Sequence, residues 1–264
     1  MSPFPTIFVS HGSPMTAIEP GAAGEAWAKL ARSLARPRAI LIASAHWETE
    51  LPMLTGSAKP QTIHDFGGFP DALYRIAYPA PGAPQVAAKA LQSLKQSGIT
   101  AGVDGCRGLD HGAWVPLRHM YPDADVPVVQ LSVQPARGAA HHVALGRALA
   151  PLSREGVLIV GSGHATHNLR DWMTQRRHPG ALPYVAQFAD WLAGRLEADD
   201  VDALVSWRES GPAAARAHPT DEHFLPLLVA FGAAGPRPRV ERVHRDIVDA
   251  ALAMDAYRFV PAAA

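Results

Sequence analysis

Continuous apolar segments alternate along the chain with longer segments whose apolar residues recur at helical spacing. The apolar segments are residues 6–10, 39–45, 126–133 and 157–161, and the helical segments are residues 24–35, 84–96, 139–154 and 183–197. Apolar runs without polar alternation are typical of strands covered on both faces of a parallel or mixed sheet. The pattern therefore predicts an α/β fold, a three-layer sandwich with a central mixed, mostly parallel sheet, in a single domain over residues 1–264.

Two stretches are too irregular for either pattern. Residues 58–84 are rich in Gly, Pro and aromatic residues, and residues 102–112 form a second irregular stretch. Loops this long in a compact domain are usually either functional or disordered. Their content of His, Asp, Phe and Tyr favours an ordered wall beside a site.

Charge and cysteine content narrow the class of protein. Lys and Arg together number 24, as do Asp and Glu, so the net charge of zero offers no basic surface to nucleic acid or an anionic membrane. Cys106 is the single cysteine, which excludes an intrachain disulfide. The N-terminus lacks a secretory signal, and no apolar run approaches the roughly 20 residues that span a bilayer. We expect a cytoplasmic protein.

Histidines follow three of the predicted strands directly. His11 comes after residues 6–10, His46 closes residues 39–45, and His164 and His167 come just after residues 157–161. Ligands of open α/β sheets bind beyond the carboxyl ends of the strands. If these strands are neighbours, their imidazoles converge on one edge of the sheet.

His223 belongs to a different kind of element. The segment His218-Pro219-Thr220-Asp221-Glu222-His223 has the features of a helix start, with a plausible N-cap and acidic residues in the first turn. The apolar run 224–231 continues this helix into the core. A histidine in a first turn can point along the surface into a neighbouring cleft.

Each histidine taken alone is more often structural than a ligand, and the repeated placement is what favours a site. Neutral imidazoles suit Zn²⁺ or Fe²⁺. The sequence contains no C-x-x-C, H-E-x-x-H or G-x-S-x-G motif. Two alternatives stay open beside a redox enzyme, namely a three-histidine zinc hydrolase and a metal-binding homologue without turnover.

The motifs together resemble one family along most of the chain. They are HGSP at 11–14, SAHW at 44–47, TIHDFGGFP at 62–70, YPAPGAP at 78–84, LDHGAWVPL at 109–117, MYPDADVPVVQLS at 120–132, VLIVGSGHATHNLR at 157–170 and HPTDEHFLPLLVA at 218–230. This set resembles the class III extradiol ring-cleavage dioxygenases of the DOPA 4,5-dioxygenase type. The resemblance implies a single catalytic domain that inserts O₂ into a catechol and yields a ring-opened muconic semialdehyde.

The resemblance also implies roles for individual histidines. The implied metal ligands are His11, His46 and His223, the implied catalytic residues are His167 as acid/base and His111 in the substrate pocket, and His64 lies near the mouth. Glu222 is an alternative third ligand beside His223. His164 departs from the family pattern, and no role is predicted for it.

The expected partners are small molecules. Phe66 and Trp114 are candidates for an aromatic wall against the substrate, although core packing explains them equally well. Fe(II) is the metal expected for activity, and Zn(II) suits the same three imidazoles. We expect a catechol and O₂ as substrates, no nucleic acid or membrane partner, and a monomer or homodimer.

Overall fold

The computed structural model describes residues 3–175, 177 and 179–262. Within these residues, eight strands form one sheet in the order β4-β3-β5-β2-β6-β1-β10-β7. The strands are β1 (Thr6–Ser10), β2 (Ala39–Glu48), β3 (Met53–Thr55), β4 (Gly102–Asp104), β5 (Val128–Val133), β6 (Val157–Gly163), β7 (Arg239–His244) and β10 (Ala256–Val260). Strands β5, β2, β6 and β1 are parallel, whereas β3 is antiparallel to β5, and β10 to β1. The predicted mixed, mostly parallel sheet is confirmed.

Helices cover both faces of this sheet. They are α1 (Gly21–Arg32), α2 (Asp71–Tyr74), α3 (Pro84–Gln96), α4 (His111–Met120), α5 (Gly138–Leu149), α6 (Pro151–Arg154), α7 (Leu169–Gln175), α8 (Pro183–Glu197), α9 (Val201–Val205), α10 (Trp207–Ser210), α11 (Ala214–Ala217) and α12 (Leu225–Ala233). Two 3₁₀ turns, Pro14–Ala17 and Pro135–Arg137, and a short ribbon of β8 (Ile247–Val248) with β9 (Leu252–Ala253) complete the fold. None of the helices in the described part of the chain has both the length and the apolar character needed to cross a membrane.

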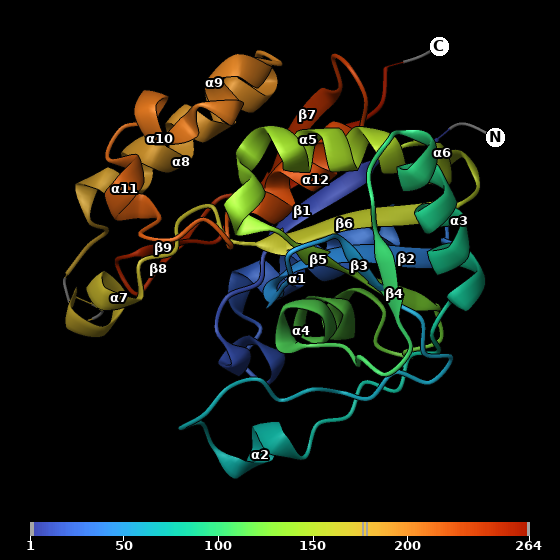
Figure 1. Cartoon of the computed structure of the whole chain (residues 1–264). Coiled ribbons are helices and arrows are strands. Elements are labelled where there is room, and N and C mark those ends of the chain that lie inside the picture. Colours follow the sequence, from blue (N-terminus) through green and yellow to red (C-terminus); the bar gives the residue numbers. More distant parts are fainter. Residues whose placement is uncertain (1–2, 176, 178, 263–264) are drawn as a thin grey trace.

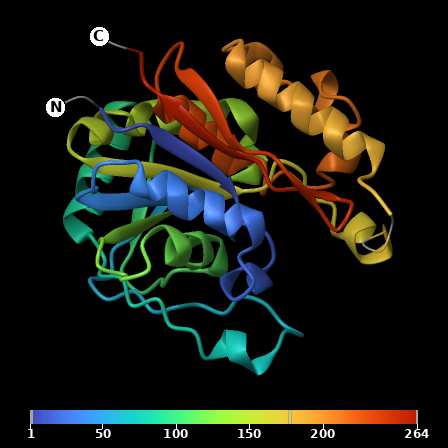
Figure 2. The ribbon, with the colours of Figure 1, turned by 180° about the vertical axis from the view of Figure 1, so that it is seen from behind.

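The sheet separates two apolar layers. Figure 1 shows α5 and α12 above the sheet and α4 below it, and in the reverse view of Figure 2 helix α1 lies on the same side as α4. Alternate residues of β2 face opposite layers, because Ile40 and Ile42 pack in the cluster that contains α1 and α4, while Leu41 and Ala43 pack with α5 and α12. The three-layer arrangement explains why β1, β5 and β6 are buried at every position and why most of their residues are apolar.

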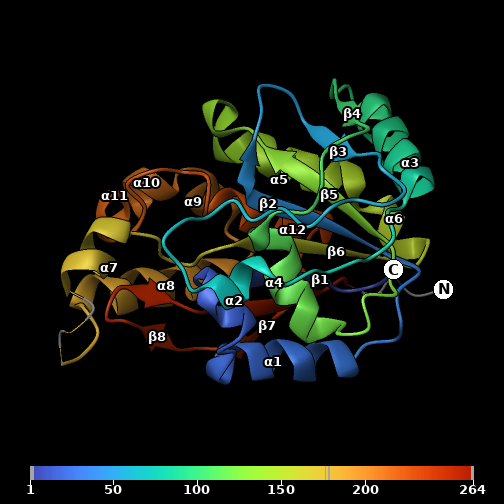
Figure 3. The same cartoon turned by 90° about the horizontal axis from the view of Figure 1, so that it is seen from below.

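The loop between β3 and α3 lies over α4 on the side away from the sheet (Figure 1, Figure 3). It pairs with the chain before α4 through an isolated bridge between Thr62 and Leu109. The indole nitrogen of Trp114, on α4, donates to the carbonyl of Ile63 at 2.9 Å. These contacts hold the loop as an ordered wall, as the composition of residues 58–84 predicts.

A buried histidine on α5 makes hydrogen bonds that bear on acid stability. Nδ1 of His142 donates to the carbonyl of Gly138 at 2.7 Å, and its Nε2 accepts from the backbone N–H of Gln134 at 3.0 Å. Burial lowers the pKa of His142 to about 4, an effect that the bond to Gly138 only partly opposes. The folded protein therefore keeps this imidazole neutral at neutral pH.

We expect the free energy of unfolding to fall as the pH is lowered from 7 to 4. The pKa of His142 lies below its usual 6.5 in the folded state, so within this window the unfolded chain binds the extra proton and stability is lost as the pH falls. At about 1.4 kcal/mol per pKa unit, the loss from His142 is on the order of 3 kcal/mol by pH 4. Urea unfolding of His142→Gln should show a smaller fall than the wild type. Equal falls in the two proteins would contradict this assignment.

Candidate active site

Three neighbouring strands bring histidines to one edge of the sheet. His11 follows the end of β1, His46 lies near the end of β2, and His164 follows β6. Because β2, β6 and β1 are adjacent and parallel, their carboxyl ends meet at that edge. The fourth contributor, His223, lies two residues before α12.

The segment that carries His223 packs directly against β6. The backbone N–H of His164 donates to the carbonyl of His223 at 2.8 Å. A Cβ added to Gly163 would lie 2.1 Å from that same carbonyl oxygen. Only glycine at the end of β6 therefore allows the close approach that brings His223 beside the strand-end histidines.

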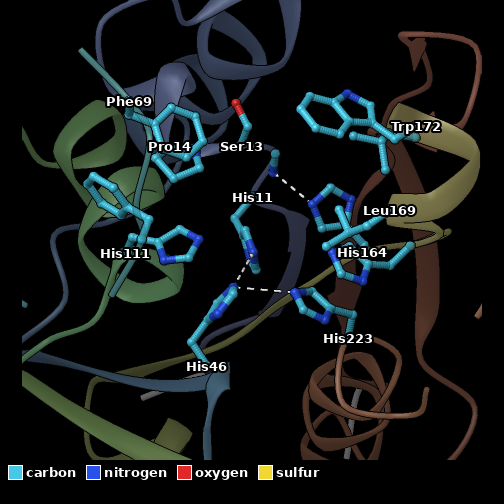
Figure 4. Close-up of a pocket in the computed structure, with 14 residues that line it drawn as sticks. His11, Ser13, Pro14, His46, Phe69, His111, His164, Leu169, Trp172 and His223 are labelled. Atoms are coloured by element: carbon cyan, nitrogen blue, oxygen red, sulfur yellow. Dashed lines mark hydrogen bonds between the residues drawn. The ribbon is translucent and has the colours of Figure 1, made fainter. Parts of the chain in front are cut away.

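Three imidazole nitrogens converge at the centre of this edge (Figure 4). Nε2 of His46 lies 3.0 Å from Nε2 of His11 and 3.3 Å from Nε2 of His223. One ligand atom from each of the three lies within 4.8 Å of the others. The predicted ligands are thus brought together from distant parts of the chain.

Hydrogen bonding on the far side of His11 fixes its tautomer. Nδ1 of His11 lies 3.0 Å from the hydroxyl of Ser162, and that hydroxyl donates its single proton to the carbonyl of Gly112. Ser162 can therefore only accept from His11, so Nδ1 carries the proton. The lone pair of Nε2 is left facing the other two histidines.

Carboxylates lie beside the corresponding nitrogens of the other two rings. Nδ1 of His223 is 2.9 Å from Oε1 of Glu222, and Nδ1 of His46 is 3.5 Å from Oδ2 of Asp65. Each carboxylate favours a proton on Nδ1 and a lone pair on Nε2. This carboxylate–histidine arrangement is common behind metal-binding histidines. Glu222 thus lies behind His223 instead of replacing it in the cluster with His11 and His46.

The electrostatics of the cluster favour a bound cation. Burial, reinforced by the neighbouring imidazoles, holds the pKa of His11 and of His223 well below the usual value. Burial and the charge of His111 lower the pKa of His46 to about 3. Neutral imidazoles are the form that binds metals, and three lone pairs directed at one another repel unless a cation lies between them.

The separations of these nitrogens match a shared ion. Two ligand atoms about 2.1 Å from one ion and about 90–110° apart around it are roughly 3.0–3.4 Å from each other. The separations of 3.0 Å and 3.3 Å around Nε2 of His46 fall in this range. His11, His46 and His223 therefore fit a divalent metal ion.

His111 enters the site from the first turn of α4. Asp110, fully buried, caps this helix by accepting from the backbone N–H of Ala113 at 3.2 Å, and the hydroxyl of Ser44 on β2 donates to it at 2.7 Å. Asp65 accepts from both the backbone N–H and Nδ1 of His111, at 2.9 Å and 3.0 Å. Burial raises the pKa of Asp65, but the hydrogen bonds and charge of His111 outweigh it and bring it to about 2.

His167 and His164 lie on the opposite side of the cluster. The ring of His167 stacks on that of His223 with centroids 3.4 Å apart, and burial lowers its pKa to about 4. Nε2 of His164 accepts from the backbone N–H of Gly12 at 3.0 Å, so this ring holds the turn that follows His11. His164, for which the sequence predicts no role, is thereby placed as a neighbour of the cluster.

A cavity of about 260 Å³ opens onto these histidines. Its lining includes His11, His46, His111, His164, His167 and His223. Its other large side chains are Pro14, Phe66, Phe69, Leu169, Trp172 and Leu252. An apolar chamber with a few polar groups converging at its floor has the composition of a small-molecule site.

Two of the residues predicted to contact the substrate, His64 and Trp114, pack against the ring of Phe66. Trp114 is fully buried, and His64, 5.8 Å from Trp114 between ring centroids, donates to the carbonyl of Ile76 at 3.0 Å. Within the described residues, neither belongs to the lining of the cavity. Their direct contact with a substrate stays a prediction.

Some residues of the site carry no signal of their own in the sequence. Leu169 and Trp172 follow His167 within two to five residues, and a helix placed next to a strand-end histidine could have suggested them. Asp65 lies inside the TIHDFGGFP motif, but its reach to His111 depends on how the loop folds over α4.

Comparison with known proteins identifies the family. The family described as the catalytic LigB subunit of aromatic ring-opening dioxygenase matches residues 5–258. A 4,5-DOPA dioxygenase extradiol of Beta vulgaris is 43% identical over 259 residues, which are 96% of each chain. A protein of the same name from Escherichia coli K12 is 42% identical over 236 residues, 87% of this chain and 84% of its own.

A solved structure agrees with these relatives. The crystal structure of an uncharacterized protein from Escherichia coli K12 matches with a TM-score of 0.80 and 33% identity, and the match covers 97% of this chain and 99% of that one. Family, relatives and fold thus agree with the resemblance carried by the sequence motifs. The chain belongs to the LigB family of aromatic ring-opening dioxygenases.

Proposed function

We propose that this single-domain enzyme is an Fe(II)-dependent extradiol dioxygenase that inserts O₂ into a catechol and releases a ring-opened muconic semialdehyde. The observation that carries the proposal is the convergence of three neutral imidazoles, those of His11, His46 and His223, on the floor of an apolar cavity. The names of the relatives, 4,5-DOPA dioxygenase extradiol, support a catechol substrate.

The side chains around the cavity suit a flat aromatic ring. Phe66 and Phe69 meet nearly edge to face, with centroids 5.4 Å apart, and both line the cavity. Such faces and edges favour stacked or edge-on contact with a further ring. They would leave the two catechol hydroxyls directed at the histidines.

The metal would have one role in the reaction, and His167 and His111, which do not hold it, would have others. A bound Fe²⁺ would supply Lewis acidity toward the catechol oxygens and the redox chemistry that a reaction with O₂ requires. His11, His46 and His223 would hold it. His167, whose imidazole is kept neutral at pH 7 by burial, would accept a hydroxyl proton and return it as the ring opens. His111, on the opposite side of the cluster from His167, would bind a substrate oxygen.

The test is oxygen uptake by metal-free protein that has been reconstituted with Fe²⁺ under nitrogen. Given air and a catechol panel of DOPA, caffeate and protocatechuate, the protein should consume one O₂ per catechol and form a yellow product. Zn²⁺-loaded protein should consume none, because Zn²⁺ has no redox chemistry. Resorcinol, whose hydroxyls are not adjacent, serves as the control substrate. No uptake with any catechol would overturn the proposal.

A further inference from the structure

Asp65, in the β3–α3 loop, lies beside both a predicted metal ligand and a predicted catalytic histidine. Its Oδ2 lies 3.0 Å from Nδ1 of His111 and 3.5 Å from Nδ1 of His46. Its Oδ1 accepts from the backbone N–H of His111 at 2.9 Å. The rings of His46 and His111 lie against each other, with centroids 3.9 Å apart, so the oxygen that is hydrogen-bonded to His111 is also within ion-pair distance of His46.

We propose that Asp65 is a positioning residue that sets the hydrogen-bonding direction of two histidines at once, keeping Nε2 of His46 as a metal ligand and Nε2 of His111 as an acceptor for a substrate hydroxyl. This inference rests on the function proposed above. An ionised carboxylate can only accept hydrogen bonds. The carboxylate therefore favours a proton on the Nδ1 atom of each ring beside Oδ2.

The consequence for His46 is that its metal-facing nitrogen stays unprotonated. The Nε2 atoms of His11 and His223 lie 3.0 Å and 3.3 Å from that of His46. A proton on Nε2 of His46 would occupy the place of the ion. Partners behind a ligating histidine fix its tautomer in the same way in other metal sites.

The consequence for His111 concerns the substrate. The ring lines the cavity and is directed into it in Figure 4, while Nδ1 is engaged by Asp65. With its proton held on Nδ1 by Asp65, the ring would present the lone pair of Nε2 to the cavity. That arrangement suits a catechol hydroxyl, which donates, better than a bound oxygen that needs a donor.

The Asp65→Asn variant tests the direction of these hydrogen bonds. The backbone N–H of His111 determines which of the two positions the amide oxygen of the new side chain occupies. The N–H of His111 requires an oxygen at the position of Oδ1. The NH₂ group of Asp65→Asn would then face both Nδ1 atoms, where it can only donate. Both rings should move their protons to Nε2, since Nδ1 must become an acceptor.

The tautomers can be read from ¹⁵N chemical shifts of the histidine rings in the metal-free protein, assigned with His46→Gln and His111→Gln. In Asp65→Asn we expect both rings to switch from Nδ1–H to Nε2–H. Titration with Co²⁺ under nitrogen should show an affinity about 10–100-fold weaker than in the wild type. With saturating Fe²⁺, the KM for the catechol should rise as well.

Two further variants separate direction from folding. Asp65→Glu keeps acceptor-only oxygens and should keep the Nδ1–H tautomers at a cost in affinity from its extra methylene group. Asp71→Asn removes an exposed carboxylate at the start of α2, in the same loop, and should leave tautomers, Co²⁺ affinity and turnover unchanged.

Unchanged tautomers in Asp65→Asn, or Co²⁺ affinity within twofold of the wild type, would overturn the inference. A switch at His111 alone would also overturn it, because the shared role would then be absent. Wild-type protein that consumes no oxygen with any catechol would defeat the proposed function only. The tautomers of Asp65→Asn would still decide the present inference.

Discussion

His46→Ala is expected to release the metal from the protein and to lower catechol-dependent oxygen uptake by about 10³-fold or more. His46 is the central member of the three-histidine cluster, since its Nε2 lies within 3.3 Å of the Nε2 atoms of both His11 and His223. A catalytic metal contributes several kcal/mol to the stabilisation of the transition state. About 4 kcal/mol corresponds to a 10³-fold change in rate.

The measurement is metal content per chain after dialysis against Fe²⁺ under nitrogen, followed by oxygen uptake. The wild type should retain about one ion and His46→Ala almost none. His141→Ala is the matched control, because this half-buried histidine on α5 contacts Gln134 and lies outside the cavity lining of the described residues. If His46→Ala bound one ion with wild-type affinity, the assignment of this cluster would be wrong.

The inner part of the fold could be predicted because apolar pattern and burial coincide there. Helices α3 and α8 begin and end at the predicted residues, and so does β1. The predicted helix over 139–154 is instead two helices, α5 and α6. Pro151 lacks the N–H that a continuous helix needs and is disfavoured within it, but is suited to the first position of a new helix.

The outer strands could not be predicted in the same way. Strands β3 and β4 have three residues each, too short for a periodicity to register. Strand β7 is half exposed and reads RVERVH, so it lacks the continuous apolar run of the inner strands. Their pairing depends on contacts with neighbours that are distant in sequence.

In the site, too, some features could be predicted from the sequence and others depend on contacts between distant segments. Histidines at strand ends could be predicted to converge, because parallel neighbours share an edge. The hydrogen-bond partners that orient them could not. Ser162 reaches His11 only because β6 lies between β1 and β2, and Asp65 reaches His111 only because its loop crosses α4. His64 and Trp114 share motifs with cavity residues, yet their side chains turn toward the loop backbone.

His167→Ala is expected to keep the metal and lose turnover. Its ring stacks on the face of His223, 3.4 Å between centroids, and contributes no atom to the cluster formed by His11, His46 and His223. Its backbone N–H donates to the carbonyl of Ala217 at 2.8 Å, a contact that alanine retains. Removing a group that transfers protons should lower kcat by about 10²–10⁴-fold.

His167→Ala removes both the ring that packs against His223 and a proton acceptor, so the effects of these two losses must be separated. His167→Gln keeps a polar side chain over the ring of His223 but cannot accept a proton near neutral pH. If proton transfer is the role of His167, both variants should lose kcat alike, while each still binds about one metal ion and takes up a catechol under nitrogen.

Metal content and turnover, measured together, distinguish the proposed metal ligands from the proposed proton-transfer residue. His46→Ala should lose metal and turnover together, whereas the His167 variants should lose turnover alone. Wild-type kcat in His167→Gln would mean that the ring acts only by packing against His223. Loss of the metal in both His167 variants would mean that stacking on His223 supports the metal site, and it would contradict the expectation that these variants keep the metal.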